Sequence, residues 1–371
     1  MRTLAIETSC DDTSVWVVAF DGTTFTVETL LAYSQIPDHQ KYGGVVPEIA
    51  SRMHSEKIIQ VLETIGRDTI KTVDFVSVTA HPGLPGALVV GKATANLLAD
   101  FFDKPIVQVN HIYGHLFSLL LERSIDDIQF PLVVLTASGG HNDVYVVKDV
   151  KNVKKDEQVL IHWLWNFSIE KIGQTLDDAA GECFDKVARM LGGPYPGGQW
   201  ISEKAQKWVN WVNWVNLVES EAVKFKRIFL SKEGFDFSFS WMKSQVSGLL
   251  KELQKKGSRN AEHGSSDGFL LSDELVCEIA YEFQEAVVEV LVKKLIRAWI
   301  KYEAKTLWIA GGVSCNERLR EYLNIELSRQ MADDRKQKIL PMVAIRPTKK
   351  VYSTDNAAMI GLVGILEKGT R

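Results

Sequence analysis

The sequence has few of the residues that hold small secreted proteins or zinc knuckles together. Its 371 residues include only four cysteines, and no two of them form a Cys-x-x-Cys pair. This scarcity argues against a disulfide framework and is typical of a protein from a reducing compartment. No apolar run reaches the roughly 20 residues that a membrane-spanning helix needs. We therefore expect no membrane span.

Strong charge of one sign is also missing, and the first residues do not have the pattern of a targeting segment. The formal net charge is −4, so any contact with nucleic acid must come from a local basic patch. Met1 passes almost directly into the apolar run Leu4–Ile6, so we expect no signal or transit segment, although a processed organellar protein would look the same. The composition, 46% hydrophobic and 24% charged, is that of a globular protein. A chain of this length suits two lobes with a cleft between them.

Apolar strands alternate with helical segments, which predicts an α/β protein. The strand, polar turn and strand of the opening restart near residue 132, so we expect two lobes of related fold. The polar side chains of the turn at 7–14 should point away from the sheet, and the polar segments 148–157 and 247–267 should be solvated loops. The expected elements are strands at 4–6, 15–20, 25–31, 75–79, 132–136, 144–147 and 306–310, and helices that end at 65, span 89–102 and contain Arg318 and Arg320.

A tryptophan recurs every third residue at Trp208, Trp211 and Trp214. On a helix these rings form one broad stripe, which suits a partner or membrane surface. Packing of the stripe onto the second lobe is the interpretation we prefer.

Two histidines have the spacing of metal ligands. His111 and His115 are four residues apart, which places both imidazoles on one face of a helix. Asp355, before an apolar C-terminal helix, offers a third ligand. Two histidines and one carboxylate leave coordination positions open, as catalysis requires. The alternative is a pair of hydrogen-bonded histidines without a metal.

Several separate motifs follow one another along the chain: Glu7–Thr13, Tyr42–Arg52, Asn110–His115, Ser138–His141, Asp177–Lys186, Tyr195–Gly198, Gly311–Asn316 and Asp355–Met359. Together they resemble the TsaD family, the tRNA N6-adenosine threonylcarbamoyltransferases, over nearly the whole chain. The resemblance implies the two-lobed α/β fold of actin, the ATP-driven heat-shock chaperones and the sugar kinases, with duplicated ribonuclease-H-like domains. We place lobe I, with the histidines, at residues 1–130 plus 353–371, and the nucleotide-binding lobe II at residues 131–352.

The resemblance also implies an activity. The chain would transfer the threonylcarbamoyl group from threonylcarbamoyl adenylate to N6 of the adenosine just 3′ of the tRNA anticodon, with release of AMP. His111, His115 and Asp355 would hold one divalent ion, iron or zinc. The residues that would bind the adenylate are Thr136, Ala137, Ser138, Gly139, Gly140, Asp185, Gly198 and Asn316.

Three residues are candidates for catalysis: Asp11, Ser138 and His141. The backbone amides from Ser138 to His141 would face the developing oxyanion, or His141 would act as a general base. Asp11 would position the amine or phosphate, or accept a proton. The chain departs from the family pattern at Asp12, where Glu is common, at His81, where Gly is usual, and at Pro85, which we expect to stiffen its loop.

The candidate tRNA contacts are Arg52, Arg346, Lys349, Lys350 and the lysines of residues 151–155. The motifs look like the bacterial and mitochondrial branch of the family. We expect a fungal-type mitochondrial protein without its transit peptide, with the bacterial cytoplasm as the alternative. Mitochondrial members resemble homodimers, and the segments 58–65 and 89–101 are candidate association surfaces unless they pack only against their own sheet.

Three other functions stay open from the sequence. A metallopeptidase would need a His-Glu-x-x-His motif, but Ile112, Tyr113 and Gly114 separate the histidines. An ATP-dependent phosphotransferase or ATPase of the same fold group would release ADP. A non-catalytic scaffold would not need three metal ligands.

Overall fold

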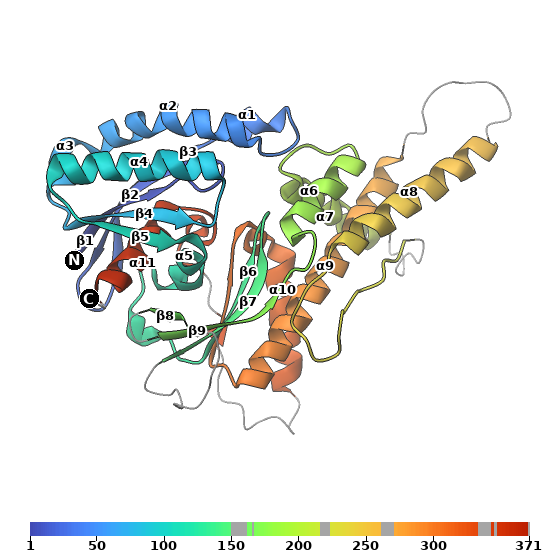
Figure 1. Cartoon of the computed structure of the whole chain (residues 1–371). Helices are drawn as coiled ribbons and strands as arrows, with labels where there is room; N and C mark the ends of the chain where they lie inside the picture. The colour runs from blue at the N-terminus through green and yellow to red at the C-terminus, as the bar shows by residue number, and fades with distance from the viewer. Residues whose placement is uncertain are drawn as a thin grey trace.

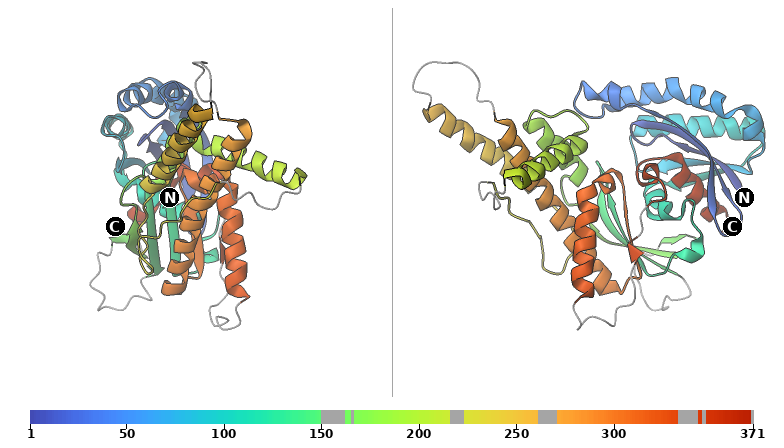
Figure 2. Two further views of the ribbon diagram at one scale, coloured as in Figure 1. Left: turned by 90° about the vertical axis from the view of Figure 1, so that its right-hand side faces the viewer. Right: turned by 180° about the vertical axis from the view of Figure 1, so that it is seen from behind.

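Two β-sheets lie side by side, each covered by helices (Figure 1, Figure 2). The computed structural model describes residues 1–149, 162–164, 167–215, 223–260, 271–332, 343–344 and 347–369. The end of the last helix lies beside the first strand, since a Cβ on Gly369 would lie 3.8 Å from Met1 Cε. No helix within the described ranges is long and apolar enough to cross a membrane.

The first sheet has the strand order β3-β2-β1-β4-β5. β1 pairs antiparallel with β2 and parallel with β4, and β5 continues the parallel part beside β4. β1, β2 and β4 are buried almost throughout, including several of their polar side chains, whereas burial alternates along the edge strand β3. The bounds are β1 Arg2–Glu7, β2 Asp12–Phe20, β3 Phe25–Ser34, β4 Phe75–His81 and β5 Ile106–Asn110.

The second sheet has the strand order β11-β10-β6-β7-β9-β8. β6 pairs antiparallel with β7 and parallel with β10, which repeats the pairing of β1 with β2 and β4. This is the repeat that the restarted strand and turn pattern predicts. The bounds are β6 Leu132–Ala137, β7 Asn142–Asp149, β8 His162–Leu164, β9 Phe167–Gln174, β10 Thr306–Ala310 and β11 Val343–Ala344.

Helices cover both faces of the first sheet, α2 and α4 on one face and α5 and α11 on the other (Figure 1). Alternate residues of β1 serve the two faces, since Leu4 and Ile6 pack with α2 and α4 whereas Ala5 packs with α11. Gly361 allows α11 to approach the sheet, because a Cβ there would lie 2.7 Å from Val18 Cγ2. The bounds are α1 Ile36–Gln40, α2 Pro47–Ile65, α3 Arg67–Lys71, α4 Pro85–Phe102, α5 His111–Phe117 and α11 Ala357–Gly369, with 3-10 turns at Ser118–Leu120, Ile125–Asp127 and Lys350–Ser353.

The second lobe is built around α9, a helix of 30 residues that is buried along most of its length. α7 and α10 pack along it, and α6 contacts it through the rings of Phe184 and Phe283, whose centroids are 5.0 Å apart. The far end of α8 extends away from the body (Figure 1). Ser272 caps α9, because its side chain accepts a hydrogen bond from Leu275 N. The bounds are α6 Ala180–Met190, α7 Gly197–Val215, α8 Ser240–Asn260, α9 Asp273–Tyr302 and α10 Glu317–Met331, with a 3-10 turn at Gly312–Cys315.

One hydrophobic core is shared by the two sheets. It contains Trp16 from β2 together with Val134 from β6 and Trp308 from β10. Trp308 also donates a hydrogen bond from Nε1 to His115 O at 3.1 Å. The lobes are therefore packed together at this end of the molecule. The domain boundaries at residues 130 and 353 stay a prediction.

Three local expectations are wrong. Residues 247–260 belong to α8 and residues 148 and 149 to β7, so neither segment is a loop, whereas residues 261–267 and 150–157 lie outside the described residues. Pro85 does not stiffen a loop but begins α4, where its missing N–H is tolerated. Glu7 does not point away from the sheet, since it is only 1% exposed.

Candidate functional site

Two histidines project from the first turns of α5, which begins where β5 ends. Asn110 caps this helix, since its Oδ1 accepts a hydrogen bond from Ile112 N at 2.8 Å. His111 follows directly, and His115 lies one turn later on the same face. His81, at the end of β4, lies with Nε2 3.3 Å from Asn110 Nδ2. The end of the parallel part of the first sheet therefore carries a group of imidazoles.

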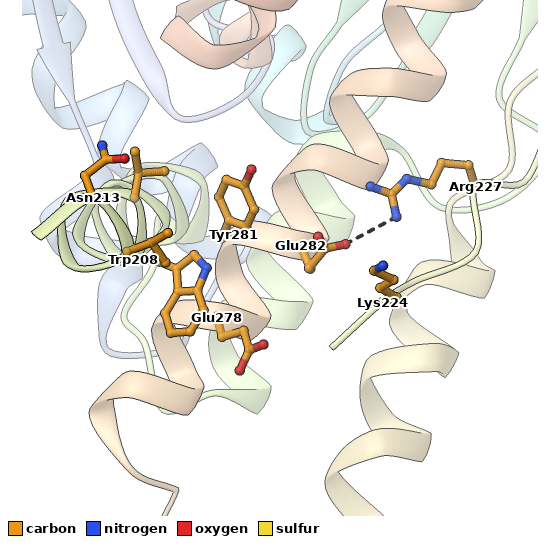
Figure 3. Close-up of a pocket in the computed structure, with 9 residues that line it drawn as sticks. Trp208, Asn213, Lys224, Arg227, Glu278, Tyr281 and Glu282 are labelled. Carbon is orange, nitrogen blue, oxygen red and sulfur yellow. Dashed lines mark hydrogen bonds and ion pairs between the residues drawn. The ribbon is translucent and has the colours of Figure 1, made fainter. Parts of the chain in front are cut away.

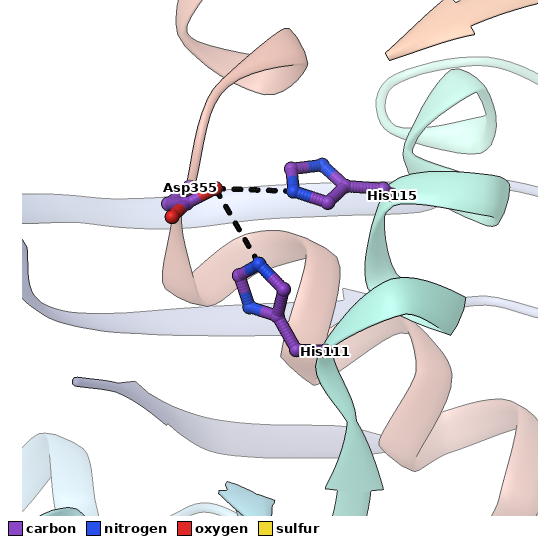
Figure 4. Close-up of side chains that lie close together, drawn as sticks. All are labelled: His111, His115 and Asp355. Carbon is purple, nitrogen blue, oxygen red and sulfur yellow. Dashed lines mark ion pairs between the residues drawn. The ribbon is translucent and has the colours of Figure 1, made fainter. Parts of the chain in front are cut away.

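Asp355 reaches the two histidines from the segment before α11 (Figure 4). Its Oδ1 lies 3.0 Å from His115 Nε2 and 3.5 Å from His111 Nε2. The imidazole rings are nearly perpendicular, at 88°, with centroids 4.8 Å apart. The structure thus brings together the three residues predicted as metal ligands, from segments far apart in the sequence.

The segment that carries Asp355 is fixed from both sheets. Gly311 N, at the end of β10, donates to Ser353 O at 2.7 Å, and Ala357 N donates to Ser14 Oγ of β2 at 2.7 Å. Gly311 has φ +87° and a Cβ there would clash with the backbone of β6, so only glycine fits this crossing. The position of Asp355 therefore depends on both lobes.

A buried glutamate behind His111 was missed by the sequence analysis. Glu7 Oε2 accepts a hydrogen bond from His111 Nδ1 at 2.9 Å and another from Thr79 Oγ1 at 2.6 Å. Ser9 Oγ lies 3.1 Å from the same His111 nitrogen. A carboxylate at Nδ1 fixes the ring and directs Nε2 toward Asp355, as in many metal-binding histidines. The only signal in the sequence was a charged residue directly after an apolar strand.

The charges of this cluster perturb one another. Burial lowers the pKa of His111, but the carboxylates of Asp355 and Glu7 outweigh burial and raise it to about 10. Burial raises the pKa of Asp355, but the charge of His111 and its hydrogen bond outweigh burial and hold it well below its usual value. The pKa of Glu7 is lowered by His111 in the same way, against the effect of burial. Without a metal, His111 is thus protonated between two carboxylates. The negative charge of these carboxylates also favours a divalent cation at the same place.

The donor set fits a divalent ion. It offers two imidazole nitrogens and one carboxylate oxygen, all within 4.8 Å of one another. His115 Nδ1 is buried and has no hydrogen-bond partner in the described part of the chain. The Asp355 side chain is 29% exposed, so the cluster is accessible from that side. Three protein ligands would leave positions for substrate.

Asp11, in the turn between β1 and β2, and Asp12, the first residue of β2, lie beside this cluster. Burial, and after it the charge of Asp355, raises the pKa of Asp11. Burial and the charge of Asp11 raise the pKa of Asp12 to about 7. His54 of α2 braces the turn, since its Nε2 lies 3.0 Å from Cys10 O. Two carboxylates with raised pKa values therefore lie near Asp355.

The β6–β7 turn uses most of its own amides. His141 N and Gly140 N donate to Ser138 Oγ at 3.1 and 3.3 Å, and Ser138 N donates to His141 O at 2.9 Å. The expectation that all four amides face an oxyanion is wrong for this conformation, because three are engaged within the turn. Only the Gly139 amide makes no hydrogen bond to the residues that are described. Burial lowers the pKa of His141, so its imidazole is neutral at neutral pH and can accept a proton.

Thr136 and Ala137 end β6 with almost no exposed surface, 2% and 0%. Thr136 Oγ1 accepts a hydrogen bond from Asp143 N at 3.3 Å and is thus engaged within the sheet. The carbonyl of Ala137 faces the close crossing of Gly311. These two residues shape the wall of the site with their main chain.

Asp185, Gly198 and Asn316 come together from α6, α7 and the start of α10. Asp185 Oδ1 accepts a hydrogen bond from Gly197 N at 2.6 Å. Ser202 Oγ donates to Gly198 O at 3.0 Å and accepts from Asn316 Nδ2 at 3.1 Å. Burial raises the pKa of Asp185. Three of the predicted adenylate-binding residues are therefore neighbours, held by one small network.

Bare backbone borders open space around these residues. A Cβ added to Gly139, Gly140, Gly198 or Gly312 would meet no atom within 4 Å. Glycines at such places allow the main chain to approach a ligand closely. The ends of β6 and β10 and the start of α7 thus leave room for a ligand.

The predicted tRNA contacts lie on the surface. Arg52, Lys349 and Lys350 are each paired with one glutamate, at 4.0, 2.7 and 3.5 Å. Such exposed pairs contribute little and can exchange for phosphates. Arg346 and residues 151–155 lie outside the described residues.

A pocket of about 320 Å³ lies apart from the triad, between α7, α9 and the segment before α8 (Figure 3). Trp208 lines it and is 8% exposed, and an ion pair of 3.3 Å between Arg227 and Glu282 forms part of its wall. Trp211 is 38% exposed and Trp214 81%. The prediction that the tryptophans pack onto the second lobe is therefore confirmed for Trp208 and wrong for Trp214.

The chain is similar to known proteins over nearly its whole length. A family model described as TsaD, tRNA N6-adenosine threonylcarbamoyltransferase, matches residues 27–362. Curated proteins named tRNA N6-adenosine threonylcarbamoyltransferase from Syntrophomonas wolfei, Staphylococcus epidermidis and Bacillus cereus are 36%, 38% and 37% identical to it. These alignments cover 99%, 97% and 99% of this chain and 93%, 90% and 92% of those proteins.

Among solved structures, T. kodakarensis HypF is similar with a TM-score of 0.52 at 13% identity. The match covers 99% of this chain and 48% of HypF, and it concerns the fold alone. The two-lobed α/β fold predicted from the sequence is confirmed.

Proposed function

This chain belongs to the TsaD family of tRNA N6-adenosine threonylcarbamoyltransferases and is a transferase that modifies tRNA, and from this premise we propose how its residues carry out the transfer. The donor is threonylcarbamoyl adenylate, the acceptor is N6 of the adenosine 3′ of the anticodon, and AMP leaves. The observation that carries the proposal is the convergence of His111, His115 and Asp355 beside a glycine-lined space.

In this proposal His111, His115 and Asp355 hold one divalent ion, iron or zinc. Such an ion supplies positive charge that orients the oxygen atoms of the substrate when it is bound. Glu7 fixes the His111 ring, and both sheets fix the segment of Asp355. The ligand geometry is therefore set by the fold, and metal analysis of the purified protein identifies the ion.

The adenylate lies along the bare backbone of Gly139, Gly140, Gly198 and Gly312, where phosphate and ribose can approach the main chain. Asp185 uses one carboxylate oxygen for Gly197 N, which leaves the other for a ribose hydroxyl. The start of α7 adds the positive end of a helix dipole, which favours a phosphate.

The transfer forms a bond between N6 and the carbamoyl carbon and breaks the bond from that carbon to the phosphate oxygen of AMP. The Gly139 amide donates to the carbamoyl oxygen as negative charge develops there. The neutral imidazole of His141 accepts the proton that N6 loses. Asp11 positions the amine. Alignment of the two substrates alone can lower the barrier by roughly 7 to 11 kcal/mol.

The direct test uses purified protein, tRNA and threonylcarbamoyl adenylate, with modified nucleoside measured by mass spectrometry. We expect the wild type to form modified nucleoside and to stop doing so after chelation. The activity of His111→Ala and of Asp355→Ala should fall by more than the roughly 10- to 100-fold that is typical of residues behind metal ligands. Release of ADP from ATP without use of the adenylate would favour a phosphotransferase. Full activity in metal-free His111→Ala would refute the metal role.

The protein also has a surface suited to a homodimer, on the outer side of α2 and α4. Ile59, Val89, Leu97 and Phe101 are 60%, 63%, 71% and 70% exposed. The three α4 residues are eight and four positions apart and therefore share one face. Exposed apolar patches of this kind mark association surfaces. The mitochondrial location, with the bacterial cytoplasm as the alternative, stays a prediction.

A further inference from the structure

An exposed aromatic ring that the proposed transfer does not use lies in the loop between α1 and α2. Tyr42 is 53% exposed, and Lys41 Nζ lies 5.1 Å from the centre of its ring. Large rings are costly to leave in water unless they pack or bind. The position of this loop suggests what the ring meets.

On one side the loop is tied to the turn that carries Asp11. Gln35 N donates to Asp11 O at 2.9 Å, and α1 begins with the next residue. His39 of α1 is fully buried, and Tyr42 N donates to His39 O at 2.9 Å. Tyr42 is thus linked through the short helix α1 to Gln35, the residue that contacts the turn of Asp11.

On the other side the loop is tied to the second lobe. Arg189 of α6 donates a hydrogen bond to Gly43 O. Gly43 has φ +69°, a backbone conformation that favours glycine. The charge of Arg189 also opposes the rise in the pKa of Asp185 that burial causes. Figure 1 shows the α1 end of the first lobe near α6. Tyr42 therefore lies at the rim where the two lobes meet over the proposed adenylate site.

We propose that Tyr42 is a stacking platform for an unpaired base of the tRNA anticodon loop, next to the adenosine that is modified. The inference rests on the proposed function. The adenosine must leave the base stack to bring N6 into the cleft, so its neighbour loses a stacking partner. An exposed tyrosine replaces that partner, since aromatic rings stack on single-stranded bases of any sequence. Lys41 and Arg189 supply positive charge for the adjoining phosphates.

The test compares Tyr42→Ala with Tyr42→Phe, which keeps the ring, and with Trp214→Ala, which removes another exposed ring on α7. Affinity for an anticodon stem-loop RNA and KM for tRNA should worsen about 5- to 150-fold in Tyr42→Ala, as for the loss of one stacked base. Tyr42→Phe and Trp214→Ala should match the wild type, and KM for the adenylate and metal content should not change. A fluorescent adenine analogue beside the modified position should be quenched by wild type and not by Tyr42→Ala.

Unchanged RNA affinity in Tyr42→Ala would overturn the inference, and so would an equal loss in Tyr42→Phe, which would assign the effect to the hydroxyl. A loss confined to kcat, or an equal loss in Trp214→Ala, would also overturn it. Wild-type protein that forms no modified nucleoside would instead refute the proposed function. The two failures are therefore distinguishable.

Discussion

Replacement of Glu7 by Gln removes one negative charge behind His111 and keeps the size of the side chain. Glu7 Oε2 accepts from His111 Nδ1 at 2.9 Å, and the residue is 1% exposed, so water cannot take its place. Loss of such support behind a metal ligand lowers metal affinity about 10- to 100-fold, or roughly 1.4 to 2.7 kcal/mol. We expect the same factor in tRNA modification at limiting metal.

The assay is a metal titration in competition with a chromophoric chelator. Glu28→Gln is the matched control, because it removes a glutamate charge from the same sheet but away from the metal site. The Glu28 side chain is 34% exposed and pairs with Arg2 on the surface. Its metal affinity should equal that of wild type. In metal-free Glu7→Gln, NMR should show a lower pKa for His111, since one of the two carboxylates that raise it to about 10 is lost.

Wild-type metal affinity in Glu7→Gln would refute the reasoning that this carboxylate supports the ion site. A lower melting temperature with unchanged metal affinity would assign Glu7 to the stability of the fold alone. Glu7 would then stabilise the fold through the 2.6 Å hydrogen bond that it accepts from Thr79.

The thermal stability of the metal-free protein should depend on pH and be greatest between about pH 4.5 and 6.5. The raised pKa of His111 stabilises the fold below pH 6.5, and this stabilisation is lost as the pH rises toward about 10. The lowered pKa values of Asp355 and Glu7 stabilise the fold above their ordinary values of 3.8 and 4.5, and this stabilisation is lost on acidification. A melting temperature that does not change with pH in the presence of chelator would contradict this. Gly139→Val should keep the wild-type melting temperature, since its Cβ meets no atom within 4 Å, but calorimetry should show at least about tenfold weaker binding of a stable adenylate analogue. Phe101→Asp should give a monomer by light scattering, because it places a charge in the apolar face of α4, and an unchanged dimer would exclude that face.

Several strands could be predicted from the sequence because buried strands contain runs of apolar residues. Leu4–Ile6 and Leu132–Leu135 are buried on both faces and contain only apolar side chains. The helix of His111 and His115 could be predicted for a similar reason, since spacing on a helix is a local property.

The rest of the site depends on contacts that no local pattern contains. A charge at the end of a strand can face either side until the neighbouring strands are placed, and Glu7 is turned inward by Thr79 of β4 and His111 after β5. The orientation of Asp355 likewise requires Ser14 and Gly311, which come from two different sheets.

α8 was mistaken for a loop over residues 247–260 because only its first part packs. Met242 and Val246 are buried four residues apart, whereas most residues from 251 to 255 are exposed. A helix that is solvated all round has no apolar stripe and shares the composition of a loop.

The order in which the ligands of the triad occur has a consequence for biogenesis. His111 and His115 leave the ribosome with the strands of the first sheet, whereas Asp355 and α11 are synthesised only after the whole second sheet. A nascent or prematurely terminated polypeptide therefore carries two ligands of three and lacks the helix that covers the inner face of that sheet. An ion at the proposed site would therefore meet all three of its protein ligands only after translation has passed Asp355.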